Sequence, residues 1–208
     1  NFMAGVAAVV KPSEFTSYLT ELMVKEIINS KILPEGSLQL IPGLGRGILD
    51  YVDHRDVVTF TGSASTGKLL KSHTNILEHS VPFNMESDSL NACVLGEDVK
   101  SDSDEFKLFI KEVYREITAK TGQKCTAVRR ILVPEKMVDE VQKQLIAKLE
   151  ETVIGNPDNK RVRMGALASK VQVERVKENV DLLMNIQEKV YGDYDDFSIL
   201  DANKEKGA

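Results

Sequence analysis

The chain has 208 residues, of which 42% are hydrophobic and 28% charged, a composition typical of a folded domain with a sizeable core. Its formal net charge of −5 gives no general attraction to nucleic acid or to an anionic membrane surface. No apolar run reaches the length of a membrane span. The apolar start, residues 1–10, lacks a basic flank and therefore predicts a buried strand rather than a signal peptide.

Strands and helices are predicted to alternate along the chain. The expected strands cover residues 7–10, 37–41, 57–61, 81–86, 91–95 and 130–133. The expected helices cover residues 16–31, 47–52, 64–73, 102–121, 134–153 and 169–189, and residues 191–208 show no pattern. This alternation predicts an α/β fold with parallel strands and crossover helices. A polar stretch near residues 86–91 predicts a boundary between two domains, 1–87 and 88–208.

The two cysteines, Cys93 and Cys125, are too few and too far apart to indicate a disulfide framework. A reducing, cytoplasmic compartment is therefore expected, and no metal site is expected. Cys93 lies in an apolar strand, which favours a small core residue. Cys125 lies between a long helix and a strand, near Lys124, Arg129 and Arg130, whose charges favour a thiolate. These surroundings alone leave Cys125 open between a structural and a catalytic role.

A run of small residues, 62–68, follows a predicted strand and opens a helix. It fits most of a P-loop, but Leu69 stands where a P-loop needs Ser or Thr to hold magnesium. The dinucleotide fingerprint Gly-x-Gly-x-x-Gly is also absent, and residues 43–47 match it only in part. The pattern alone therefore leaves a phosphate-binding helix start and a tight strand–helix turn equally open.

Glu86 ends an otherwise apolar strand. The carboxyl ends of parallel strands are where sites form, and an apolar setting would suit a carboxylate to general-base work. Asp88 fits a solvated loop acid better than Glu86 does.

Five motifs occur in an order and spacing that resemble the aldehyde dehydrogenase superfamily across nearly the whole chain. They are residues 9–14, residues 33–43, residues 58–63 with Gly67, Met85-Glu86, and residues 122–126 around Cys125. The resemblance implies a partial Rossmann-like coenzyme domain over 1–87 and part of an α/β catalytic domain over 88–208. Residues 84–91, 93–99 and 122–130 are similar to a narrower group, the dehydrogenase domains of the bifunctional ring-opening enzymes of aerobic phenylacetate breakdown. Those domains oxidise a CoA-linked semialdehyde to an acid.

The same resemblance implies roles for individual residues. Cys125 would attack the aldehyde carbonyl to give a thiohemiacetal, hydride would pass to NAD or NADP, and Glu86 would activate water to hydrolyse the thioester. The backbone N–H of Cys125 would help to hold the oxyanion. The residues expected to bind the coenzyme are Lys11 and Glu14 at the adenosine ribose, Ser13 beside them, and Gly62, Ser63 and Gly67 at the pyrophosphate. Glu14 favours NAD because a carboxylate repels a 2′-phosphate, although Lys11 and Ser13 leave NADP open.

The resemblance also predicts a chain truncated at both ends. The family's oxyanion asparagine is expected upstream, and Asn1 lies too close to Lys11 to be that residue. The glutamate-phenylalanine-glycine-proline segment that holds the nicotinamide ribose is expected downstream. Little dehydrogenase activity is therefore expected of these 208 residues, and apolar sheet surface left exposed would favour self-association into a homo-oligomer.

Three alternatives to a hydrolytic aldehyde dehydrogenase remain. A CoA-acylating dehydrogenase would pass the acyl group to CoA, but Glu86 argues against it because hydrolysis needs that base. A second alternative is a non-catalytic protein that serves as a scaffold or in oligomerisation. The expected truncation favours this role, whereas the presence of both Cys125 and Glu86 argues against it. A P-loop nucleotide triphosphatase is the most remote. The partner expected is a small-molecule aldehyde, with no nucleic acid and no membrane.

Overall fold

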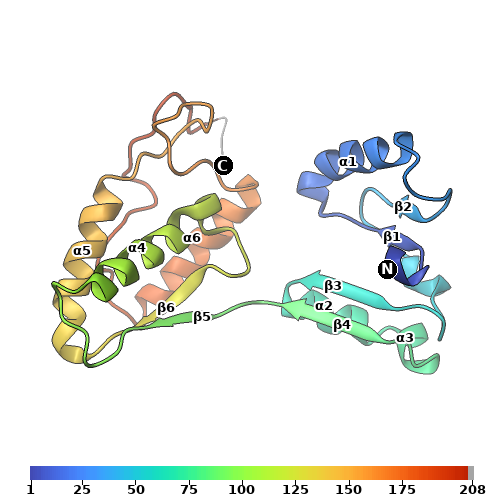
Figure 1. The fold of residues 1–208 in the computed structure, drawn as a ribbon, viewed down its shortest axis with the longest axis horizontal. Coiled ribbons are helices and arrows are strands. Elements are labelled where there is room, and N and C mark those ends of the chain that lie inside the picture. The colour runs from blue at the N-terminus through green and yellow to red at the C-terminus, as the bar shows by residue number, and fades with distance from the viewer. Residues whose placement is uncertain (206–208) are drawn as a thin grey trace. The chain divides into compact units, whose positions relative to one another are not determined.

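The computed structural model describes residues 1–205 and divides into two compact units, Asn1–Asp88 and the chain from Ser89 onward (Figure 1). The boundary predicted from the sequence, after residue 87, falls one residue before this division. None of the helices within residues 1–205 is long and apolar enough to cross a membrane.

The first unit contains two parallel strand pairs with helical connections. The strands are β1 (Ala8–Val10) with β2 (Leu38–Leu40), and β3 (Val58–Gly62) with β4 (Phe83–Ser87). The helices are α1 (Ser17–Asn29), α2 (Ala64–Lys71) and α3 (Thr74–Glu78), with short 3-10 turns at Phe2–Ala4, Glu14–Thr16 and Ile48–Tyr51. The parallel α/β arrangement predicted from the sequence is confirmed, because helices join the strands of each pair.

The helix expected over residues 64–73 is in fact two helices. Ser72 ends α2, and its Oγ donates a hydrogen bond to the carbonyl of Leu69. His73 then takes extended backbone angles, and its Nδ1 accepts a hydrogen bond from the N–H of Asn75 at the start of α3. The helical periodicity missed this break because a capping histidine leaves the apolar spacing largely unchanged.

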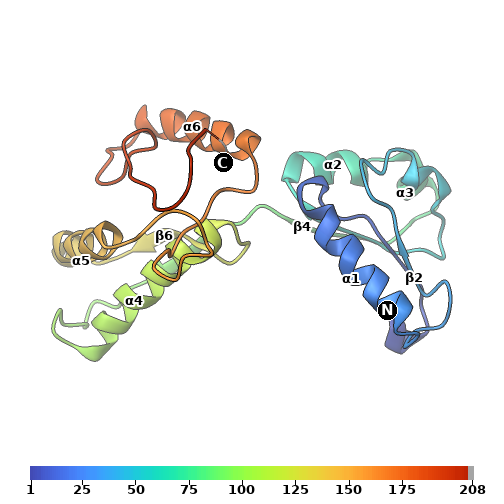
Figure 2. The same ribbon diagram turned by 90° about the horizontal axis from the view of Figure 1, so that it is seen from above.

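The second unit is built on the parallel pair β5 (Asn91–Val94) and β6 (Val128–Leu132), with helices α4 (Asp104–Thr118), α5 (Val138–Glu150) and α6 (Lys170–Met184) (Figure 2). A 3-10 turn, Glu135–Met137, precedes α5. Its core gathers apolar side chains from α4, α5 and the chain beside the strands, namely Leu95, Phe106, Phe109, Ile110, Val113, Met137, Val141 and Leu145. This core fixes α4 against α5 and β6, and so fixes the segment that joins α4 to β6.

Helix α4 is shorter than the sequence predicts. It was expected to reach residue 121 but ends at Thr118, and a 3-10 turn, Ala119–Gly122, follows. Within that turn Lys120 and Thr121 adopt positive φ angles of 52° and 56°, outside the right-handed helix. The apolar stripe continues to Ile117 and gives no sign of the change in backbone beyond it.

Large apolar side chains lie exposed in both units. In the first unit they include Val9, Leu19, Leu22, Met23, Leu69 and Leu77, and in the second Val94, Leu132, Leu182 and Ile186. Such surface is typical of an interface, so self-association stays a prediction.

Candidate active site

Cys125 is exposed and lies in the short loop between the Ala119–Gly122 turn and β6. Three residues in a row before it, Lys120, Thr121 and Gly122, have positive φ angles of 52°, 56° and 70°. Each non-glycine residue in this region costs roughly 1–3 kcal/mol, so such a turn persists only where its surroundings hold it. The loop that carries the thiol is therefore held in one backbone conformation by contacts with the rest of the unit.

Side-chain hydrogen bonds hold this loop against the chain that precedes α6. Thr121 Oγ1 donates to the carbonyl of Gly165 over 3.0 Å, and Gln123 Oε1 accepts from the N–H of Ala168 over 2.8 Å. Gln123 Nε2 also donates to the carbonyl of Lys120 over 3.1 Å. The turn is thus fixed from residues more than forty positions downstream, a relationship that local sequence pattern does not predict.

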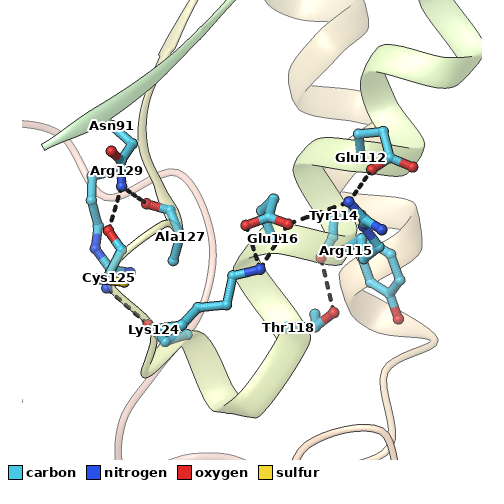
Figure 3. Close-up of polar contacts among 11 residues, drawn as sticks. Asn91, Glu112, Tyr114, Arg115, Glu116, Thr118, Lys124, Cys125, Ala127 and Arg129 are labelled. Carbon is cyan, nitrogen blue, oxygen red and sulfur yellow. Dashed lines mark hydrogen bonds and ion pairs between the residues drawn. The ribbon is translucent and has the colours of Figure 1, made fainter. Parts of the chain in front are cut away.

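Asn91 holds the other side of the same loop (Figure 3). Its Nδ2 donates to the carbonyl of Cys125 over 2.7 Å and to that of Ala127 over 3.0 Å. Because Asn91 opens β5 and pairs with Val128 of β6, these bonds tie the loop to the strand pair. Arg129 adds a third tie, since its Nη2 donates to the carbonyl of Gly122 over 2.8 Å. With the backbone so fixed, the Cys125 side chain is left exposed.

Lys124 is not a free cation beside Cys125. Its ammonium lies 2.7 Å from Glu116 Oε2 and donates to Oε1 over 2.8 Å, so its charge is paired with a carboxylate on α4. The same hydrogen bond from Lys124 is the main reason that the pKa of Glu116 lies below its ordinary value. The sequence-based argument that Lys124 favours a thiolate therefore needs correction, because it ignored this partner.

Cys93 is half-buried on β5 and packs against the core of the second unit, which confirms the prediction of a core residue. Burial raises the pKa of the Cys93 thiol. A thiol with a raised pKa is a poor nucleophile at neutral pH, so the two cysteines stand in different chemical settings.

Glu86 lies on β4, one residue before the strand ends, and is paired in register with Thr61 of β3. Its side chain points from the exposed face of the strand, and the first unit by itself supplies no apolar shell around it. The expectation of an apolar setting is therefore not met within this unit. Its position near the carboxyl end of a parallel strand is as the sequence predicts.

Lys11 and Glu14, predicted at the coenzyme ribose, lie on one exposed segment after β1. Lys11 Nζ is 4.0 Å from Glu14 Oε1, and Ser13 precedes the 3-10 turn that Glu14 opens. Gly45 approaches this segment, since a Cβ there would lie 3.0 Å from Lys11 Cγ. From the sequence, residues 43–47 were a partial match to the dinucleotide fingerprint, and this approach to Lys11 was not predicted.

Gly62, Ser63 and Gly67 form a tight strand–helix turn at the start of α2. Ser63 caps the helix, its Oγ accepting from the N–H of Thr66 over 3.2 Å. Gly67 is buried, and a Cβ there would collide with Met85 Sδ and lie 3.0 Å from Met85 Cγ. A Cβ at this position would force the Met85 side chain to shift, so glycine allows the close approach of α2 to β4.

A carboxylate already occupies the start of α2. Asp88 Oδ2 accepts a hydrogen bond from the N–H of Ala64 over 3.2 Å, and the Asp88 N–H donates to the carbonyl of Gly62. Asp88 lies exposed just beyond the end of β4, as expected of a solvated loop acid, and its contact with α2 is an addition that the sequence did not predict. The contact shows that the first N–H of α2 donates to an anionic oxygen, the kind of partner that a helix N-terminus favours.

The amino-acid sequence of this chain is similar to those of known proteins. Residues 1–201 match the family model described as "Aldehyde dehydrogenase family". The chain is 40% identical over 201 residues to a 3,4-dehydroadipyl-CoA semialdehyde dehydrogenase of Aromatoleum evansii, covering 97% of this chain and 39% of that protein. It is 30% identical to a 1-pyrroline-5-carboxylate dehydrogenase of Staphylococcus aureus, covering 86% of this chain and 35% of that protein. The chain thus spans well under half the length of these curated relatives.

Solved structures share the fold. A betaine aldehyde dehydrogenase of Staphylococcus aureus, crystallised with NAD+, superposes with a TM-score of 0.74 at 26% identity, covering 86% of this chain and 34% of that one. An aldehyde dehydrogenase of Pseudomonas syringae gives a TM-score of 0.78 at 23% identity, covering 91% and 38%. The second likeness is a likeness of fold alone.

Proposed function

Because the chain belongs to the aldehyde dehydrogenase family, we propose that it carries the nucleophile and coenzyme-binding residues of an NAD(P)-dependent dehydrogenase that oxidises an aldehyde to a carboxylic acid. The observation that carries this proposal is the setting of Cys125. It is an exposed thiol on a strained loop whose backbone is tied on three sides by Asn91, Arg129 and Gln123. A preorganised loop of this kind is what positions a reacting atom.

The proposed chemistry begins with the Cys125 thiolate adding to the aldehyde carbonyl, which forms a C–S bond and an oxyanion. The backbone N–H of Cys125 donates to that oxyanion. When bound, a nicotinamide coenzyme would supply the acceptor for the hydride on that carbon, so that the adduct on Cys125 would become a thioester. Glu86 then takes a proton from water, the hydroxide adds to the thioester, and the thiolate leaves with release of the acid.

The coenzyme is proposed to lie on the first unit. Lys11 and Glu14 take the adenosine ribose hydroxyls, and Ser63 with the first N–H of α2 takes a pyrophosphate oxygen, in place of the Asp88 carboxylate. Glu14 favours NAD over NADP, because its carboxylate would repel a 2′-phosphate. Cytoplasmic location and a homo-oligomer are part of the same proposal.

The substrate class proposed is a CoA-linked semialdehyde. Its support is the 40% identity, over nearly this whole chain, to a relative named for 3,4-dehydroadipyl-CoA semialdehyde. Glu86 supports hydrolysis of the thioester rather than transfer of the acyl group to CoA, because water needs a general base whereas a CoA thiolate does not.

Protection against alkylation tests the proposal directly. Iodoacetamide at neutral pH should label Cys125, and a semialdehyde bound as the thiohemiacetal should slow that labelling while leaving the labelling of Cys93 unchanged. Peptide mapping by mass spectrometry gives both rates in one sample. Equal slowing of both thiols, or none, would contradict an aldehyde-binding nucleophile at Cys125.

A further inference from the structure

The ion pair between Glu116 and Lys124 is the most enclosed charged contact of the second unit that the proposed chemistry does not use. The side chains are only 16% and 25% exposed, respectively. Within residues 1–205, Oε2 of Glu116 is buried and has the ammonium 2.7 Å away as its charge partner, but no hydrogen bond of suitable angle. A carboxylate so enclosed depends on its cations, and removal of Lys124 takes away the nearer of them.

This pair closes the strained turn before Cys125. Glu116 lies on the last turn of α4 and Lys124 lies eight residues further on, so the contact spans the three residues with positive φ angles, Lys120 to Gly122. In Figure 3 the Lys124 side chain extends from the loop to Glu116 on α4, away from Cys125. Lys124, the residue directly before the candidate nucleophile, is thus bound through its side chain to α4, which supplies much of the core of the unit.

Breaking the pair would also change the charge balance of Lys124, the residue next to Cys125 in the sequence. An unpaired ammonium one residue from Cys125 would favour the thiolate, and an unpaired carboxylate would oppose it. The other charged groups on or against this segment are Lys120 in the turn, Arg129 on β6, Arg115 on α4, and Arg163, whose Nε donates to Thr118. Arg115 lies 2.6 Å from Glu112 but 3.5 Å from Glu116, so Lys124 is the nearer cation to Glu116.

We propose that Glu116 is a positioning residue for Cys125: it anchors Lys124 to α4 and offsets the charge of Lys124 beside the thiol. The inference rests on the proposed role of Cys125 as nucleophile. This positioning role differs from a purely structural one in its effect on the thiol. Removing Glu116 and removing Lys124 should shift the pH dependence of Cys125 alkylation in opposite directions. Loss of Glu116 leaves Lys124 without this carboxylate, whereas loss of Lys124 leaves Glu116 with only the more distant Arg115, 3.5 Å away.

The test is the pH profile of Cys125 alkylation by iodoacetamide, measured by peptide mapping in the 208-residue chain. Glu116→Gln keeps the shape of the side chain and should move the profile to lower pH, with labelling at neutral pH about threefold faster. Lys124→Met should move the profile to higher pH, with labelling about threefold slower. The double variant, neutral at both positions, should return the profile close to that of the unsubstituted chain.

Asp104→Asn is the matched control. It removes a carboxylate from the first turn of the same helix, where the partner is the exposed Lys107 rather than a loop residue. Its profile should not move. Circular dichroism melting of each variant shows separately how much the loss of the pair weakens the fold.

The outcomes separate this inference from the proposed function. Preferential labelling of Cys125 over Cys93 in the unsubstituted chain, with opposite shifts in the two single variants, supports the inference. Preferential labelling with no shift, or with shifts in the same direction, overturns the inference alone. Unfolding of both single variants and the double variant, with Cys93 and Cys125 then labelled equally, also overturns it, because the pair would then be structural. Equal labelling in the unsubstituted, folded chain overturns the proposed nucleophile itself.

Discussion

The side-chain amide of Asn91 lies 2.7 Å from the carbonyl oxygen of Cys125 and 3.0 Å from that of Ala127, so one residue at the start of β5 fixes the backbone on both sides of Thr126. Both bonds use the two hydrogens of a single amide nitrogen, a geometry that an aspartate or an alanine does not reproduce.

Asn91→Asp should therefore destabilise the second unit and loosen the loop. The substitution places a carboxylate oxygen against two carbonyl oxygens, which removes two hydrogen bonds and adds repulsion, at a cost of about 1–3 kcal/mol. Urea unfolding measures the loss. Asn179→Asp, an exposed asparagine on α6, is the control and should change the unfolding free energy by much less. Equal losses in the two variants would argue against a special role for Asn91.

Gly67→Ala should destabilise the first unit, because the added Cβ meets the Met85 side chain between α2 and β4. The expected cost is about 1–3 kcal/mol, as for overpacking of a close helix–sheet contact. Thermal melting followed by circular dichroism measures it. Lys68→Ala, at the exposed neighbouring position of α2, should leave the melting temperature nearly unchanged, and a similar fall in both variants would contradict the packing argument.

The Glu116–Lys124 pair should make stability depend on pH in the acid range. The pKa of folded Glu116 lies below its ordinary value, so its contribution is fully present above that value and is lost as pH falls through the folded pKa. Unfolding midpoints should therefore fall more steeply below about pH 4.3 in the unsubstituted chain than in Glu116→Gln. If the unfolding midpoints of the two proteins changed with pH in the same way, the pair would make no contribution to the pH dependence of stability.

Asp88→Ala should strengthen coenzyme binding to the first unit. The carboxylate occupies the first N–H of α2 and repels a phosphate, so its removal should tighten NAD+ binding by about two- to fivefold, the range expected for a charge at a helix N-terminus. Isothermal titration calorimetry gives the dissociation constant. Glu35→Gln, an exposed acid elsewhere in the unit, is the control, and equal or weaker binding by Asp88→Ala would place the phosphate elsewhere.

The strand and helix order was predictable from the sequence, because apolar spacing and turn residues act locally. The ends of α2 and α4 were not, since they depend on His73 as a cap and on left-handed residues at 120 and 121. The candidate nucleophile was found by its order among family motifs. Its supports, Asn91 and Glu116, were missed because side-chain contacts across 34 and eight residues leave no periodic signal.

The assignment of Cys125 as nucleophile is tested most directly by the ratio of its alkylation rate to that of Cys93 in the folded, unsubstituted chain at neutral pH. An exposed thiol on a fixed loop should react several times faster than a half-buried thiol whose pKa burial raises. The expected result is a clear preference for Cys125, which is lost when the chain is unfolded in urea. Equal, slow alkylation of both thiols in the folded chain would contradict it.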